Sequence, residues 1–404
     1  MITRGEQMLA LRRRRMASTL PILRGGFRPF FFGGAAWGLI ALTLWICSLA
    51  GEVSLPSAFD PLSWHRHEML FGFVGAVVAG FLLTAIPNWT GRLPIAGPPL
   101  ASLFGLWFAA RIAVLFSGEI GRLIPAVLDV GFYLTLALVG AREVLLSKNR
   151  NLPIVGMVLL FGLANALDHA GAVGLVGSSD LGWMFALSLV VLMISLIGGR
   201  ITPSFTRNWL VKQGVTTGLP TQPARFDMVV IGVTAFALLA WITAPPGYLS
   251  GGLLMAAAAL QIVRLARWSG VRTVSDPLVL ILHVGYAWVP VGLALLGASL
   301  IGVPIPRSAA IHALTAGAMT TMILAVMTRA SLGHTGRELK ANGATVAIYG
   351  LITVGALLRV TAPLQLLDYR PAMEVAGLAW GGALLLFLIA YAPVLWRARL
   401  GEST

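Results

Sequence analysis

Six histidines are the residues of this sequence best suited to chemistry, because imidazole nitrogen is a good ligand for iron, copper and zinc. They are His65, His67, His169, His283, His312 and His334. The chain has a single cysteine, which argues against iron–sulfur clusters and thiolate zinc sites. Haem iron is commonly held by an axial histidine. The chemistry that these residues indicate is therefore binding of a metal ion or of haem.

Acidic residues next to two of the histidines could support such a site. Glu68 follows His67 directly, and Asp168 precedes His169. A carboxylate that accepts a hydrogen bond from one ring nitrogen orients the other nitrogen toward a metal. We therefore predict Glu68 and Asp168 as supporting groups around the ligands.

The amino-acid composition indicates the class of protein and the kind of secondary structure in which these residues lie. Of the 404 residues, 57% are hydrophobic and only 11% are charged, whereas about a quarter of the residues in soluble domains are charged. These values exclude an ordinary soluble enzyme, a disordered chain and a disulfide-stabilised scaffold. Membrane-spanning strands would appear as short alternating segments, and the sequence has none. We predict an all-α polytopic membrane protein.

Twelve apolar stretches are long enough to cross a bilayer as helices, which takes roughly 20 residues. They are 29–50, 68–88, 98–117, 123–145, 153–176, 181–199, 228–246, 248–264, 277–301, 308–328, 342–360 and 373–396. We expect a single transmembrane domain over 29–396, preceded by a basic segment over 1–28 and followed by a tail over 397–404.

The basic residues orient this predicted bundle. The net charge is +14, and when the loops alternate between the two sides, 23 of the 29 Lys and Arg residues fall on the side of the termini. Because short basic loops stay in the cytoplasm, both termini are expected there. We interpret the basic segment 1–28 as a topology signal that contacts anionic membrane lipids, not as a site for nucleic acid.

This orientation places the histidines at two depths. The outer group is His65, His67, His169 and His312, and the inner group is His283 and His334. A lone histidine in a helical bundle is usually a packing residue, but four at one depth, from three helices, favour a site for a metal ion or haem.

His65 and His67 are two positions apart, which on a helix separates their directions by about 200°. Both could reach one metal only if His65 lies in a loop. The preceding Asp60-Pro61 makes a loop-to-helix junction plausible at that point.

Two further ionisable residues fall inside predicted spans. Arg111 lies in 98–117 and Asp129 in 123–145, at similar distances from the outer ends of these antiparallel neighbours. Buried charges are costly in lipid, so we expect these two to pair. Such a pair is either structural or part of a path for protons or ions.

Three predicted spans end on the cytoplasmic side in segments that mix arginine with small polar residues, at 87–92, 199–209 and 328–337. We expect each segment to be a turn that caps its helix. Arginine and backbone amides in such a turn can hold a carboxylate or a haem propionate, and Arg329 is the candidate for that role.

Seven stretches, in order between residues 25 and 340, resemble the NnrS family of bacterial membrane proteins. They are GFRPFF at 26–31, WHRHEMLFG at 64–72, PNWTGR at 87–92, GRITPSFTRN at 199–208, LHVGYAW at 282–288, HALTAGA at 312–318 and MTRASLGHTG at 327–336. The resemblance implies a multi-pass protein of the bacterial inner membrane that contains haem and copper. It also implies a link to nitric oxide metabolism and to resistance to nitrosative stress.

The resemblance further implies cofactor ligands among these histidines. The candidates are His65, His67, His283, His312 and His334, together with His169. It assigns neither the haem ligands nor the copper ligands individually, and it names no electron donor.

We therefore expect a twelve-helix haem and copper protein that binds nitric oxide, a small, neutral and lipid-soluble ligand, or protects metal centres from it. Two other functions stay open. A secondary transporter of a metal or small solute would use the histidines or the Arg111–Asp129 pair as coupling groups. A redox enzyme resembling a quinol-linked nitric oxide reductase would turn nitric oxide over. The sequence has no Walker A motif, which excludes an ATP-driven pump within this chain.

Overall fold

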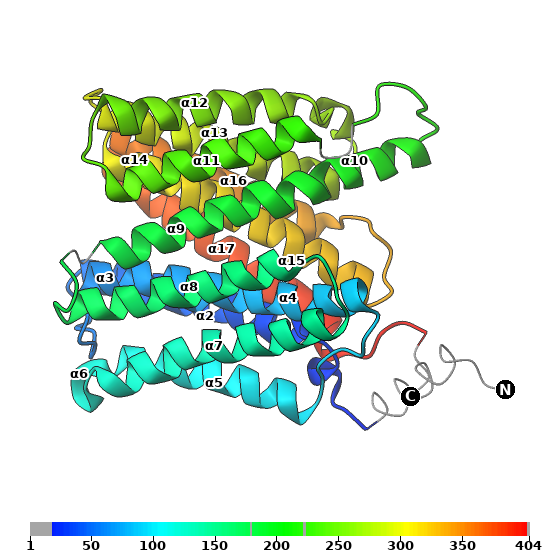
Figure 1. The fold of residues 1–404 in the computed structure, drawn as a ribbon, viewed down its shortest axis with the longest axis horizontal. Helices are drawn as coiled ribbons and strands as arrows, with labels where there is room; N and C mark the ends of the chain where they lie inside the picture. The colour runs from blue at the N-terminus through cyan, green and yellow to red at the C-terminus, as the bar shows by residue number, and fades with distance from the viewer. Residues whose placement is uncertain (1–17, 178–179, 221–223, 402–404) are drawn as a thin grey trace. The chain divides into compact units, whose positions relative to one another are not determined.

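Every regular element in the computed structural model is a helix, over the residues that the structure describes, 18–177, 180–220 and 224–401 (Figure 1). Twelve of these helices are long and apolar enough to cross a membrane. This confirms the prediction of an all-helical, twelve-span membrane protein. The basic residues of 1–17 lie outside the described part.

The observed spans follow the predicted ones closely. They are Phe27–Leu49, Pro61–Thr90, Pro98–Leu115, Leu123–Leu146, Leu152–Ala172, Leu181–Lys212, Arg225–Thr243, Tyr248–Ala266, Pro277–Leu300, Arg307–His334, Gly343–Leu364 and Tyr369–Trp396. Most bounds differ from the prediction by a few residues. The second, sixth and tenth spans are clearly longer than predicted.

Each of these three long spans contains a π-helical segment. The second is α3 (Pro61–His67), η2 (Glu68–Val74) and α4 (Gly75–Thr90); the sixth is α9 (Leu181–Met193), η3 (Ile194–Gly198) and α10 (Gly199–Lys212); the tenth is α14 (Arg307–His312), η5 (Ala313–Met319) and α15 (Thr320–His334). A π segment inserts extra backbone into a helix and occurs frequently at functional sites.

Two of the predicted cytoplasmic turns are in fact helical. The segment 199–209 lies within α10, and 328–337 is helical as far as His334. Proline and glycine are tolerated in such helices because neighbouring groups satisfy the freed backbone. At Gly91 the prediction holds, since α4 ends at Thr90 and Gly91 takes the left-handed conformation, with φ of 66°.

The chain forms two compact units. The first comprises Met1–Ala186, Ala330–Glu338 and Phe387–Thr404, and the second comprises Leu187–Arg329 and Leu339–Leu386.

Besides the long spans, the helices are α2 (Phe27–Leu49), α5 (Pro98–Leu115), α6 (Ser117–Ile120), α7 (Leu123–Leu146), α8 (Leu152–Ala172), α11 (Arg225–Thr243), α12 (Tyr248–Ala266), α13 (Pro277–Leu300), α16 (Gly343–Thr361) and α17 (Tyr369–Trp396). Short 3₁₀ turns lie at η1 (Pro21–Leu23), η4 (Gly270–Thr273) and η6 (Ala362–Leu364).

Small residues on the second span let aromatic rings of the first unit approach its backbone. A methyl group on Gly75 would clash with the Tyr133 hydroxyl, and one on Gly80 would lie 2.8 Å from the Phe31 ring. Small residues at helix interfaces permit this close packing in membranes. In the second unit, Gly251 of α12 meets the carbonyl of Gly297 on α13 in the same way.

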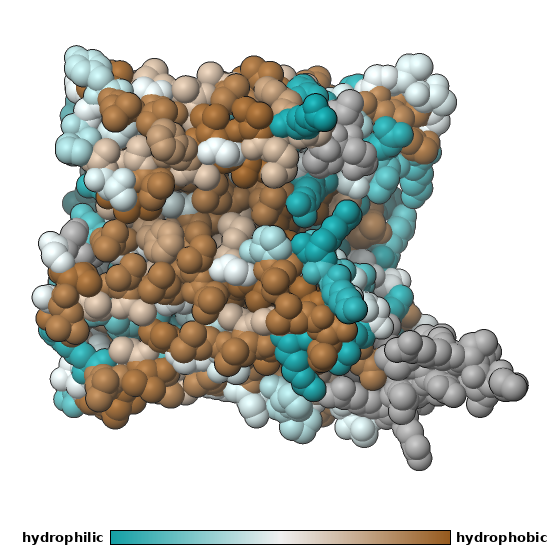
Figure 2. Space-filling view, in the orientation of Figure 1, coloured by the Kyte–Doolittle hydropathy of each residue, from teal (hydrophilic) through white to brown (hydrophobic). Residues whose placement is uncertain are grey.

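The surface of the helices is apolar, as contact with lipid requires. Hydrophobic residues dominate the middle of the face shown in Figure 2. Large side chains that point outward include Leu138, Phe236 and Leu378, which are exposed to at least 60%. Exposing so much apolar surface to water is unfavourable, so this pattern supports a location in a membrane.

Candidate metal centre

Four helices of the first unit place their polar side chains in one buried cluster. His67 ends α3 and Glu68 begins η2; Arg111 lies on α5, Asp129 on α7, and Asn165, Asp168 and His169 on α8. We refer to these seven residues as the His67 cluster. Each of them is at most 8% exposed. The sequence therefore buries several charged groups in the interior of this unit.

Asp60 begins the helix that carries His67. Its carboxylate accepts hydrogen bonds from the backbone N–H groups of Leu62 and Ser63, both at 3.1 Å. Pro61 occupies the first helical position, where its missing N–H costs nothing. Burial acts to raise the pKa of the Asp60 carboxyl, but hydrogen bonds to Ser63 and Leu62 and the charge of Arg66 outweigh it. The pKa therefore lies below its usual value.

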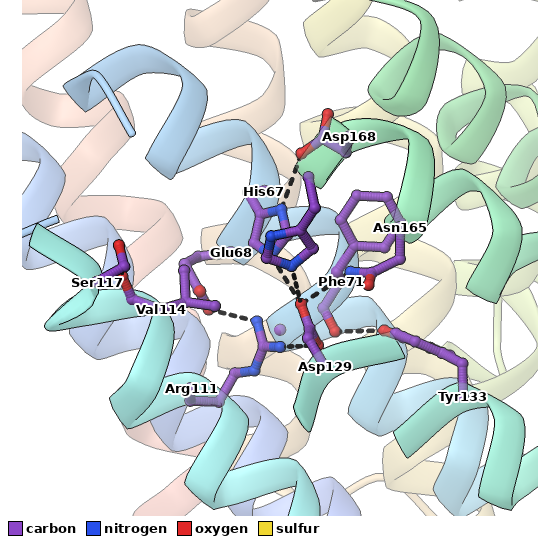
Figure 3. Close-up of polar contacts among 12 residues, drawn as sticks. His67, Glu68, Phe71, Arg111, Val114, Ser117, Asp129, Tyr133, Asn165 and Asp168 are labelled. Atoms are coloured by element: carbon purple, nitrogen blue, oxygen red, sulfur yellow. Dashed lines mark hydrogen bonds and ion pairs between the residues drawn. The ribbon is translucent and has the colours of Figure 1, made fainter. Parts of the chain in front are cut away.

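Two imidazoles and one carboxylate meet at the centre of the cluster (Figure 3). Nε2 of His67 lies 2.8 Å from Oδ2 of Asp129, and Nε2 of His169 lies 3.2 Å from the same oxygen. One ligand atom from each residue lies within 4.8 Å of the others. Two nitrogens and one oxygen at these separations match the ligand spacing around a single transition-metal ion.

Asp168 holds the other side of the His67 ring. Its Oδ2 lies 2.8 Å from Nδ1 of His67. A neutral imidazole carries one N–H and cannot donate to carboxylates on both nitrogens. Either the ring is a cation, or Nδ1 donates to Asp168 while Nε2 binds a metal, or one carboxyl group is protonated and donates to the ring. The second arrangement is the carboxylate–histidine–metal relation that orients ligands in metal sites.

Arg111 links the cluster to the π segment. Its guanidinium donates to Glu68 at 2.9 Å and forms a second ion pair with Asp129. Nε1 of Trp37 donates to the same Glu68 oxygen at 2.5 Å. Nδ2 of Asn165 donates to Asp129 at 2.8 Å. The Asp129 carboxylate thus accepts from a cation and an amide while it faces both histidines.

Side chains also satisfy the irregular backbone of η2. The Tyr133 hydroxyl donates to the Phe71 carbonyl at 2.6 Å, and Nε1 of Trp107 donates to the Gly72 carbonyl at 3.0 Å. These carbonyls lie in the π segment, where the regular α-helical pattern is interrupted. Tertiary contacts therefore maintain the π segment next to His67.

The charge of the cluster is unbalanced. The cluster holds three carboxylates, those of Glu68, Asp129 and Asp168, and one guanidinium, that of Arg111. Two negative charges therefore remain while both imidazoles are neutral. Uncompensated charge in a membrane interior is costly. One divalent cation would neutralise the cluster, and so would two protons on the imidazoles.

Aromatic rings pack closely around His67. The rings of Phe59, Phe71 and His169 lie with their centroids 4.9, 5.0 and 4.9 Å from that of His67. A single metal ion could lie between the three ligand atoms without displacing any of these rings.

The remaining predicted ligands of the first unit lie apart from this group of three ligand atoms. The His65 ring stacks on Trp45 with a centroid separation of 4.8 Å, and His65 belongs to the same helix as His67. The loop-to-helix junction therefore precedes His65 and gives it no route to the same ion. The His334 ring packs against Phe27 at 5.5 Å.

The second unit holds the two other histidines and Arg329. Nε2 of His283 lies 2.8 Å from the Thr206 hydroxyl, and Nδ1 of His312 lies 2.7 Å from the Ser308 carbonyl. The Arg329 guanidinium lies over the Phe205 ring at 4.1 Å. These contacts neither assign nor exclude cofactor roles for the three residues.

His283 has one ring nitrogen to spare. Its Nδ1 is buried and has no hydrogen-bond partner among the described residues. A methyl group built on Gly270 would lie 2.5 Å from this atom. The Gly270 backbone therefore packs closely against this nitrogen.

Arg264 is buried, although it is counted above among the basic residues on the side of the termini. It is the last residue of the predicted span 248–264, lies in the last turn of α12 and is 1% exposed. Its guanidinium pairs with Asp227 of α11 at 2.8 Å and donates to the Tyr286 hydroxyl at 2.9 Å. A partner on a neighbouring helix lets the arginine stay buried, and charge counting along the sequence does not detect such a partner.

The sequence analysis missed the role of Asp129 and did not name Asn165. Asp129 was expected only as a partner of Arg111, yet it also faces both histidines. Asn165, Asp168 and His169 are spaced i, i+3 and i+4, which places all three on one face of α8. This pattern could have identified the helix face that completes the cluster.

Comparison with known proteins then identifies the family. A family model described as NnrS protein matches residues 21–399, nearly the whole chain. The chain belongs to the NnrS family. Comparison with curated proteins found no match. In this NnrS protein the WHRHEMLFG stretch at 64–72 provides His67 and Glu68 of the cluster and most of η2.

Proposed function

We propose that this NnrS protein binds a redox-active transition-metal ion at His67, Asp129 and His169 in the bacterial inner membrane, and handles nitric oxide there. The observation that carries the proposal is the buried group of two imidazoles and one carboxylate, with Asp168 on the far nitrogen of His67. Copper is the metal that the family resemblance implies, and iron also suits two histidines and one carboxylate.

Different side chains of the cluster would bind the ion and position its ligands. His67 and His169 would supply nitrogen ligands, and Asp129 would supply an oxygen ligand that Arg111 and Asn165 keep in place. Asp168 would keep the proton of His67 on Nδ1, which leaves Nε2 free for the ion. The bound ion would supply affinity for nitric oxide.

Metal analysis of the purified protein tests the site. We expect stoichiometric copper or iron in the wild type and a loss of most of it in His67→Ala, His169→Ala and Asp129→Asn. Asp180→Asn is the matched control, because Asp180 pairs with Arg66 outside the ligand group. His65→Ala should also keep the metal. Equal metal in all variants would show that the assigned ligands are wrong.

The same preparations test the link to nitric oxide. Adding nitric oxide should change the optical or electron paramagnetic resonance spectrum of the wild type, and of Asp180→Asn, but not of His67→Ala. An intact spectrum response in the variant without metal would contradict the proposal.

Haem is the second cofactor that the resemblance implies. Because we assign His67 to the metal ion, and because Gly270 lies close to the free ring nitrogen of His283, we propose that a haem would use His65, His312 or His334. A Soret band in the purified protein, lost on substitution of one of these three, would assign its ligand.

Proton-coupled transport is a second candidate function. It is favoured by the charge count, since two protons could neutralise the cluster in place of a divalent ion. Proteoliposomes with an imposed proton gradient separate the two functions. Gradient-driven solute flux in protein that holds no metal would favour transport, and a permanently bound metal would favour the nitric oxide function.

A further inference from the structure

A cavity of about 410 Å³ in the first unit reaches the side chain of His169. It lies between the first turns of α7 and the last turns of α8. Phe59, from the loop before α3, also lines it. Its walls are small and apolar and include Ala126 on α7 with Ala166 and Ala170 on α8. A residue of the candidate metal centre therefore forms part of the wall of an apolar space.

The cavity opens toward the apolar surface of the unit. Leu123 and Leu175 also line it, and they are 76% and 80% exposed. Ser117 and Arg122 also line it and donate to backbone carbonyls at 2.8 and 3.0 Å. Because most of the lining is apolar, a strongly hydrated molecule would lose its water here for few hydrogen bonds.

Phe59 separates this space from the rest of the metal group. Its ring lies 5.5 Å from that of His169 and 4.9 Å from that of His67. His169 in turn contacts Asp129. A molecule inside the cavity therefore contacts His169 and Phe59, and the Phe59 ring lies between it and His67.

We propose that this cavity is a lateral entrance through which a small neutral molecule, such as nitric oxide or dioxygen, passes from the lipid to the metal ion, with Phe59 restricting the last step. The inference rests on the proposed function, since it assumes a metal at His67, Asp129 and His169.

The rate of nitric oxide binding to the metal-loaded protein tests the route. Ala126→Phe and Ala170→Phe fill the cavity from its two walls, and each should slow association about tenfold, because a blocked route raises the barrier to entry; a tenfold change corresponds to about 1.4 kcal/mol. Phe59→Ala should speed association. Val127→Phe is the matched control, because Val127 lies beside Ala126 on α7 but is exposed.

A measurement without metal separates this inference from the proposed function. Xenon should occupy the cavity in crystals of metal-free wild-type and Val127→Phe protein and be absent from Ala170→Phe. Unchanged association rates in both filled variants, with full metal content, would overturn the entrance. A protein that takes up xenon but binds no metal would overturn the proposed function and leave only an apolar cavity.

Discussion

Arg111 is the residue on which the charge balance of the His67 cluster depends. It is fully buried and is the single guanidinium that neutralises Glu68 and Asp129. Replacing it with methionine leaves two carboxylates in a dry interior. We expect Arg111→Met to cost about 3–5 kcal/mol of stability, the range for breaking a buried pair. A thermal unfolding scan of the protein in nanodiscs measures this.

A double variant separates charge from packing at the same position. In Arg111→Met with Glu68→Gln, one stranded carboxylate is removed while the volume is kept. The double variant should therefore melt above the single variant Arg111→Met. If both melt together, the loss reflects packing of the arginine stem and not its charge.

Sequence reasoning located part of the centre at the residue scale. It placed Arg111 and Asp129 at similar depth, and the structure pairs them. It grouped histidines by depth alone, which cannot show direction. His65 and His67 illustrate this, because they share a helix but one stacks on Trp45 while the other faces Asp129. Direction depends on contacts between helices, which a single sequence does not display.

The π segment η2 is the element that shapes the centre. Gly72 lies in it, and a methyl group there would lie 2.5 Å from Oε2 of Glu68 and 2.8 Å from Nε1 of Trp37. Gly72→Ala should therefore break the Trp37–Glu68 hydrogen bond and lower both the melting temperature and the metal content. Gly105→Ala on α5 is the control, because no atom lies within 4 Å of the added methyl group. Equal behaviour of the two variants would contradict this packing argument.

Helix positions were predictable from the sequence, but helix irregularities were not. Apolar runs of about 20 residues identify spans because lipid forces the backbone to bond within itself. The π segment at η2 is held by side chains of other helices, Tyr133 and Trp107. The residues 68–74 alone do not indicate that Tyr133 and Trp107 will contact them. The long spans also extend beyond their apolar cores. Their polar ends are helical because they contact other helices, and such contacts are not visible in a single sequence.

At the scale of the whole molecule, the number of spans determines whether the two termini share a side of the membrane, and the basic residues predict which side that is. An even number of crossings would put both termini on the same side of the membrane. The distribution of Lys and Arg predicts that this side is the cytoplasm, because 23 of 29 fall in the segments expected on the side of the termini. Burial of Arg264 within α12 removes one residue from that count without changing its sign.

Reporter fusions test this orientation directly. Alkaline phosphatase, which is active only outside the cytoplasm, should be inactive after residue 396 and in the loop 213–224, and active in the loop 365–368. A fluorescent protein that matures only in the cytoplasm should give the opposite pattern and serves as the control. Phosphatase activity after residue 396 would reverse the orientation. It would also move the ends of α5 and α8 near the His67 cluster from the outer to the inner side of the membrane.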